Sequence, residues 1–172
     1  MRRTSFADSE CPIARTVDLV GDWWTPLVLR EIFLGERRFD GVQRALGIGR
    51  NVLTERLRRL VDEGVLARTR YQDRPPRFEY GLTEKGQALL PVLAAMIEWG
   101  DAWLDGRPEP SLVLRHRTCG KRMRVSVVCG ECHRPLAAGD VQVERVRPVP
   151  SRRDPGGAGR RRLARTARRR SA

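Results

Sequence analysis

The sequence is short of long apolar runs, lysine and histidine, and it has no segment that resembles a leader. The longest apolar stretch, around Leu89 to Ile97, contains Pro91 and is too short to span a bilayer. Because the N-terminal residues lack the apolar segment of a secretory signal, we expect a cytoplasmic protein without a membrane partner. Four cysteines in such a chain indicate thiols or metal ligands rather than a disulfide framework.

Lysine accounts for only two of the 34 basic residues, and the arginines are unevenly distributed. Residues 1–110 have no net charge, residues 111–150 carry +5 and residues 151–172 carry +8, which accounts for the +13 of the chain. From residue 148 onward almost no residue is apolar, so burial cannot offset the entropy cost of ordering. We therefore predict a disordered Arg-rich tail over residues 148–172, whose charge favours contact with a polyanion.

Hydrophobic residues make up 40% of the chain, and from about residue 8 to 106 they recur with helical spacing. The predicted helices cover residues 12–20, 25–35, 40–47 and 49–63, with Thr25 and Asp40 as N-caps of the second and third. Leu53, Leu57 and Leu60 form the apolar face of the fourth. Two short helices joined by a tight glycine turn predict a helix-turn-helix, and we see no internal repeat.

Two strand-like stretches follow, Val65–Tyr71 and Phe78–Leu82, joined by a basic turn. A hairpin directly after a helix-turn-helix makes a winged helix, so the predicted fold class is mainly α with a small β wing (α+β). One continuous helix is predicted over residues 83–104, with apolar residues on more than half of its circumference. A single small domain does not need so wide an apolar face, so we expect a second subunit to cover it.

Three stretches resemble, in this order, the HxlR-type winged helix-turn-helix regulators, which are relatives of the MarR group. They are CPIARTVDLVGDWWTPLVLREIFLGERRF, VLTERLRRLVDEGVLART and YGLTEKGQALLPVL. The resemblance covers residues 11 to about 106 and predicts a domain over residues 8–106. It implies a bacterial transcription regulator that binds double-stranded DNA as a homodimer through its first and last helices, and both a repressor and an activator stay open. Family members often have Ser-Pro where this chain has Gly49-Arg50, which leaves the following helix without a side-chain N-cap.

The helix over Gly49–Glu63 is the predicted recognition helix, because a helix fits the major groove of B-DNA and its first residues reach base edges. Arginine can read guanine and asparagine can read adenine, whereas arginines of a wing meet phosphates. The alternative is that these arginines are solvated surface residues. The residues predicted to face the bases are Arg50, Asn51, Thr54 and Arg58, and those predicted to contact phosphates are Arg59, Arg68, Arg70, Arg74 and Arg77, the last four in the basic wing Arg68–Arg77.

Cys11 stands where the family commonly has a cysteine, which in some members senses oxidants or electrophiles. A thiol near a helix N-terminus has its pKa lowered by the helix dipole, so the resemblance implies a redox-sensor role. A buried, apolar cysteine is the alternative.

Residues 111–147 contain His116-x2-Cys119, nine intervening residues and Cys129-x2-Cys132, on either side of a predicted strand from Met123 to Val128. Three thiolates and one imidazole suit tetrahedral zinc, so we predict a structural zinc ion in a zinc-ribbon-like module. A segment of about 35 residues has too little core to fold without such help. Three alternatives stay open: haem attachment at C-x-x-C-H, a redox dithiol, and a loop without metal.

Two classes of function remain. The first is a sequence-specific transcription regulator with a small-molecule or redox effector. The second is a thiol-dependent redox protein that uses Cys11 or the pair Cys129/Cys132. The sequence has no Ser-His-Asp set, no phosphate-binding glycine loop and no paired catalytic carboxylates, so we predict that the protein is not an enzyme.

Overall fold

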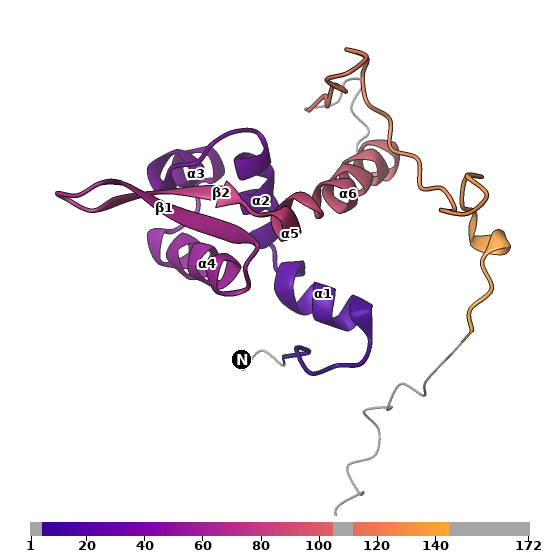
Figure 1. Cartoon of the computed structure of the whole chain (residues 1–172), viewed down its shortest axis with the longest axis horizontal. Coiled ribbons are helices and arrows are strands. Elements are labelled where there is room, and N and C mark those ends of the chain that lie inside the picture. The colour runs from indigo at the N-terminus through magenta and orange to yellow at the C-terminus, as the bar shows by residue number, and fades with distance from the viewer. Residues whose placement is uncertain (1–4, 105–111, 145–172) are drawn as a thin grey trace, which may run out of the picture. The chain divides into compact units, whose positions relative to one another are not determined.

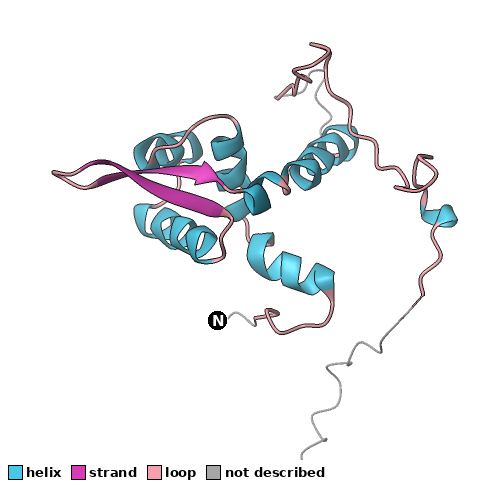
Figure 2. Cartoon of the chain, viewed as in Figure 1, coloured by secondary structure: helices cyan, strands magenta, loops and turns pink. Residues whose placement is uncertain are grey.

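The computed structural model of the protein describes residues 5–104 and 112–144. The elements are α1 (Pro12–Val20), α2 (Thr25–Phe33), α3 (Phe39–Leu46), α4 (Arg50–Asp62), β1 (Leu66–Gln72), β2 (Arg77–Leu82), α5 (Glu84–Gln87), α6 (Leu90–Trp103) and a 3-10 helix, η1 (Ala138–Asp140). The antiparallel β1–β2 hairpin extends beyond α3 and α4, as the wing of a winged helix does (Figures 1 and 2). The predicted fold class, mainly α with a small β wing, is confirmed.

The hydrophobic core lies among α2, α3, α4 and the start of the wing. The predicted apolar face of α4 is buried there, with Leu53, Leu57 and Leu60 at most 1% exposed. The side chains that complete the core are Val28, Leu29, Ile32, Val42, Ile48, Val65 and Leu66. Burial of one such leucine or valine contributes about 1.5–3 kcal/mol, so this cluster fixes the position of α4.

The two predicted N-caps are wrong. Trp24 is the N-cap residue of α2, and the carboxylate of Asp22 accepts hydrogen bonds from the backbone N–H groups of Trp24 (2.9 Å) and Thr25 (3.0 Å) and from the Thr25 hydroxyl. Asp22 thereby satisfies two N–H groups at the start of α2, and Thr25 donates to Asp22 instead of capping the helix. Helix α3 begins at Phe39 after the extended residue Arg38, so Asp40 lies in its first turn.

The predicted continuous helix over residues 83–104 is wrong as well, because the chain forms α5 and α6 with a break at residues 88–89. Pro91 has no backbone N–H to donate to the carbonyl of Gln87, and its ring crowds that carbonyl. Pro91 instead occupies the first turn of α6, where its missing N–H costs nothing. Thr83 caps α5, because its hydroxyl accepts a hydrogen bond from the N–H of Gly86 (3.1 Å).

The end of α4 is joined to the wing and to α5. Gly64 has φ +67° and lets the N–H of Val65 donate to the carbonyl of Leu60 (2.9 Å), which ends the helix. The hydroxyl of Thr83 donates to the carbonyl of Gly64 (2.7 Å). A Cβ on Gly86 would lie 2.3 Å from the carbonyl oxygen of Val65, so only glycine allows this approach.

Residues 112–144 contain two hairpin-like loops with isolated bridges between Arg115 and Arg122 and between Val128 and Pro135. The predicted strand from Met123 to Val128 does not form, because within residues 112–144 no neighbouring strand supplies the hydrogen-bond ladder that a strand needs. The predicted tail, residues 148–172, lies outside the described residues, which end at residue 144. The predicted domain boundaries stay predictions. Among the described helices none has the length and apolar character that crossing a membrane requires.

Candidate nucleic-acid interface

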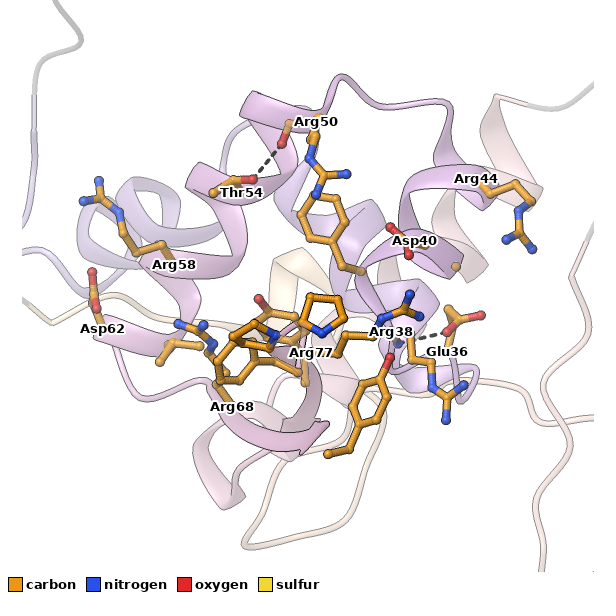
Figure 3. A pocket seen from close by; sticks show the side chains of 18 residues that line it. Glu36, Arg38, Asp40, Arg44, Arg50, Thr54, Arg58, Asp62, Arg68 and Arg77 are labelled. Atoms are coloured by element: carbon orange, nitrogen blue, oxygen red, sulfur yellow. Dashed lines mark hydrogen bonds between the residues drawn. The ribbon is translucent and has the colours of Figure 1, made fainter. Parts of the chain in front are cut away.

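A basic groove lies between α4, the start of α3 and the wing (Figure 3). Six arginines line it and outnumber the three acidic residues there, Glu36, Asp40 and Asp62. A concave surface with an excess of one charge concentrates the field on ligands of opposite charge. The six arginines are Arg38, Arg44, Arg50, Arg58, Arg68 and Arg77.

Five of the predicted DNA-contacting residues meet in this groove. Helix α4 contributes Arg50, Thr54 and Arg58, and the wing contributes Arg68 and Arg77. All five are exposed. Side chains from two elements that are separate in the sequence therefore share one surface.

Helix α4 begins without a side-chain cap, as predicted, because its N-cap residue is Gly49. Arg50 lies over the ring of Phe39, 5.0 Å from its centroid. The hydroxyl of Thr54 donates to the carbonyl of Arg50 (2.8 Å), so it retains its lone pairs as acceptors. Asn51 is exposed on the same turn but does not line the groove.

The wing holds its arginines in two ways. The guanidinium of Arg68 lies 3.4 Å from the centroid of the Phe78 ring, which restricts a side chain that is otherwise exposed. Arg70 forms an ion pair with Asp73 (3.1 Å) and donates to the backbone carbonyl of Gln72 (3.3 Å), so it braces the turn. Arg74 lies exposed beyond the strands at the wing tip and outside the groove.

Arg59 does not line the groove and contacts α1 instead. Its Nη2 atom donates to the buried carboxylate of Asp18 on α1 (2.8 Å), which also accepts from the N–H of Phe6 (3.0 Å). One turn earlier on α4, Arg56 lies 3.1 Å from Asp22. These two ion pairs connect α4 to α1 and to the turn after it.

Two arginines of the groove, Arg38 and Arg44, were not predicted from the sequence. Arg38 reaches the groove because the residues before α3 pair with β2, where the N–H of Tyr80 donates to the carbonyl of Arg37 (2.8 Å). A hydrogen bond to Glu79 (3.1 Å) raises the pKa of Arg38, which stays charged. No local pattern indicates this placement, because it depends on a strand pairing between segments about 40 residues apart.

The predicted thiol and metal residues lie outside the groove. Cys11 is the N-cap residue of α1 and is partly exposed. In the second described stretch, the Sγ atom of Cys119 lies 3.4 Å from Nδ1 of His116. Within residues 5–104 and 112–144, no three His, Cys, Asp or Glu side chains lie close enough together to hold a metal ion.

Helices α1 and α6 present apolar side chains to solvent. In α6 only Ala94 is buried, while Trp99 is 57% and Trp103 76% exposed. In α1, Ile13 is 73% and Val17 48% exposed. Large exposed apolar faces of this kind mark protein interaction surfaces.

The chain is similar in sequence to known helix-turn-helix proteins. The sequence model of a family described as HxlR-like helix-turn-helix matches residues 19–108. The HTH-type transcriptional regulator Rv3095 of Mycobacterium tuberculosis is 43% identical over 133 residues, which cover 77% of this chain and 84% of that protein. A 133-residue match must reach at least residue 133 of this chain, so it extends past the helix-turn-helix domain.

The chain also resembles solved structures. The crystal structure of PA1607, described as a transcription factor, has a TM-score of 0.74 at 38% identity and covers 83% of this chain and 99% of its own. The redox regulator HypR in its reduced form has a TM-score of 0.52 at 34% identity and covers 55% of this chain and 95% of its own.

Proposed function

Because the chain belongs to the HxlR-like helix-turn-helix family, we propose that it is a DNA-binding transcription regulator that acts as a homodimer. The observation that carries this proposal is the basic groove, where arginines of α4 and of the wing line one surface. The relatives named above are transcription regulators, which supports a regulatory and non-enzymatic role.

Helix α4 enters the major groove in this proposal, and its first two turns face the bases. Arg50 can donate two hydrogen bonds to guanine and Asn51 can pair with adenine. Thr54 and Arg58 follow on the exposed side of the helix. Since α4 begins without a side-chain cap, its first backbone N–H groups are free to approach a phosphate.

The wing contacts the DNA backbone in this proposal. Arg68, Arg74 and Arg77 supply charge, while Arg70 supports the turn that carries Arg74. Contacts to phosphate set position and affinity but read no sequence. Arg59, which the sequence analysis placed among the phosphate contacts, is assigned here to holding α1 against α4 through Asp18.

The test compares duplexes selected from a random pool by the protein with scrambled duplexes of the same length. Arg50→Ala and Asn51→Ala are expected to weaken binding to the selected site by about 1–3 kcal/mol and to leave scrambled DNA less affected. Arg74→Ala is expected to weaken both equally and to reduce the salt slope by about 1. Arg124→Ala, at an exposed arginine outside the winged helix and its groove, is the control. Equal losses on both duplexes for Arg50→Ala and Asn51→Ala would contradict the assignment of α4.

The homodimer is supported by the exposed apolar faces of α1 and α6. A recess lined by α2, α6, Leu112 and Leu114 has a volume of only about 200 Å³, below the usual 300–1,000 Å³ of small-molecule sites, which favours a protein partner on this side of α6. A second subunit would cover it and place two copies of α4 about one DNA turn apart.

Light scattering and band-shift stoichiometry test the dimer. Trp99→Glu is expected to shift the protein to monomer and to reduce affinity for an inverted repeat, because it places a charge on the apolar face. Gln87→Glu adds the same charge at the exposed end of α5 and serves as the control. A wild-type monomer that binds one half-site with full affinity would contradict the dimer.

A redox response at Cys11 is a second proposal, because this thiol is partly exposed at the start of α1 and HypR is named as a redox regulator. Alkylation with N-ethylmaleimide is expected to change DNA affinity in the wild type and in a Cys119→Ser/Cys129→Ser/Cys132→Ser variant. It should have no effect in Cys11→Ser. An unchanged affinity after complete alkylation of Cys11 would contradict this role.

A further inference from the structure

Two loops in the second described stretch have the same backbone hydrogen bonds, thirteen positions apart. In the first loop, residues 116–121, the N–H of Gly120 donates to the carbonyl of His116 (2.8 Å) and the N–H of His116 donates to the carbonyl of Lys121 (3.0 Å). Below this loop, the N–H of Met123 donates to the carbonyl of Leu114 (2.7 Å).

The second loop, residues 129–134, repeats each of these bonds. The N–H of His133 donates to the carbonyl of Cys129 (2.9 Å), and the N–H of Cys129 donates to the carbonyl of Arg134 (2.9 Å). The N–H of Leu136 donates to the carbonyl of Val127 (2.9 Å). The structure therefore contains a backbone repeat that the sequence analysis did not find.

The repeat shows which residues of the two loops stand at equivalent positions. The fifth residue of each loop has a positive φ, +67° at Gly120 and +58° at His133. His133 therefore has the turn-closing place of a glycine, and histidine is one of the residue types that tolerate it. The first and fourth residues of each loop carry the metal-binding groups, which gives the pairs His116/Cys119 and Cys129/Cys132.

The first pair already has the spacing that a shared zinc ion requires. With a Zn–S bond of about 2.3 Å and a Zn–N bond of about 2.0 Å, two ligands of a tetrahedron lie about 3.5 Å apart. The Sγ atom of Cys119 and Nδ1 of His116 are separated by 3.4 Å. The loop thus holds these two side chains in a bidentate arrangement.

The second pair stands at the same two loop positions as the first. The backbone N–H groups of Glu131 and Cys132 point to the sulfur of Cys129, so the loop folds back over the first residue of the pair. Two cysteines at this spacing are common ligands of structural zinc.

We propose that the two loops bind one structural Zn²⁺ per chain through His116, Cys119, Cys129 and Cys132. In the described residues the ligands are brought together as two pairs and not as one set. The linker over residues 123–128 has no regular structure, and no residue from 112 to 144 is buried, so no packed core resists the approach of the loops. Metal binding then supplies the tertiary contact that this segment lacks.

The experiment uses the full chain, purified in reducing buffer, loaded with Zn²⁺ or Co²⁺ and freed of excess metal. Elemental analysis should give about one zinc per chain, and the Co²⁺ form should show the intense visible bands of a tetrahedral site with thiolate-to-cobalt charge transfer. Cys129→Ser and His116→Ala should each lose most of the bound metal. His133→Ala, the matched control in the turn-closing position, should retain it.

DNA binding by each variant reports on the winged helix separately, so a failure of the metal site and a failure of the proposed regulator function are distinguishable. Zinc below about a tenth of an equivalent in the loaded wild type would overturn the proposal. One zinc per two chains, retention of zinc by Cys129→Ser, or a haem absorption band at the C-x-x-C-H sequence would overturn it as well.

Discussion

Trp24, the N-cap residue of α2, provides no side-chain cap, and the carboxyl group of Asp22 takes that role. The same carboxyl group forms an ion pair with Arg56 of α4 (3.1 Å). Burial raises the pKa of this carboxyl, but the hydrogen bonds from Thr25 and Trp24 and the charge of Arg56 together outweigh burial. The net pKa of Asp22 is therefore lower than its ordinary value of 3.8. Its charged form is preferred in the folded state.

Asp22→Ala is expected to lower the free energy of unfolding by about 1 kcal/mol, because it removes the acceptor for the first N–H groups of α2. Because the folded-state pKa lies below the unfolded one, the charge of Asp22 stabilises the fold above pH of about 4, and this contribution disappears as the pH falls through the folded pKa. Urea unfolding at pH 7 and at pH 3 measures the effect, which should shrink at the lower pH. Asp8→Ala, at an exposed site, is the control, and a loss of the same size there would contradict the capping role.

At the scale of elements, the ion pair between Asp18 and Arg59 joins α1 to α4. The carboxylate is buried, and the Arg59 side chain is 28% exposed, so solvent screens this pair only in part. Helix α1 also carries one of the apolar faces assigned to the dimer. In the proposed complex, the pair therefore couples the proposed dimer surface to the helix proposed to read DNA.

Asp18→Asn is expected to lower the free energy of unfolding by about 2 kcal/mol, since it leaves a partly buried guanidinium without its counter-charge. Glu55→Gln, which removes an exposed carboxylate 3.5 Å from Arg56, should change stability by less than about 0.5 kcal/mol. Thermal and urea unfolding measure both.

Arg59→Gln should likewise reduce stability, while the slope of log K against log salt for DNA binding stays the same. A reduced slope would mean that Arg59 contacts phosphate.

At the scale of the whole molecule, the charge is concentrated at the C-terminus, where residues 151–172 contain nine arginines and one aspartate. Deletion of these residues is expected to leave the fold intact and to lower affinity for scrambled DNA. Each phosphate contact contributes about −0.9 to the slope of log K against log salt, so the slope should become shallower. Binding measured at several salt concentrations gives this slope. An identical slope after truncation would mean that the tail does not contact DNA.

Helices α1 to α4, the wing and the outward side of α4 could be predicted from the sequence, because each depends on local signals. Periodic leucines define the buried face of α4, glycines end α3 and α4, and the alternating stretch around Phe78 and Tyr80 identifies a strand of the wing. A residue on the opposite side of a buried face is exposed by geometry alone. Arg50, Thr54 and Arg58 were therefore found without a structure.

Only the tertiary structure decided where distant segments meet. Arg38 lines the groove because its segment pairs with β2, and Arg59 binds α1 because Asp18 lies across from it. Asp22 caps α2 through a side chain three residues ahead of Thr25, and Pro91 starts a new helix instead of being absorbed in one. The equivalence of the two loops is carried by backbone hydrogen bonds, which different side chains can share. Sequence patterns record local preference, whereas these contacts depend on how the core orients each element, and that orientation exists only after the chain has packed.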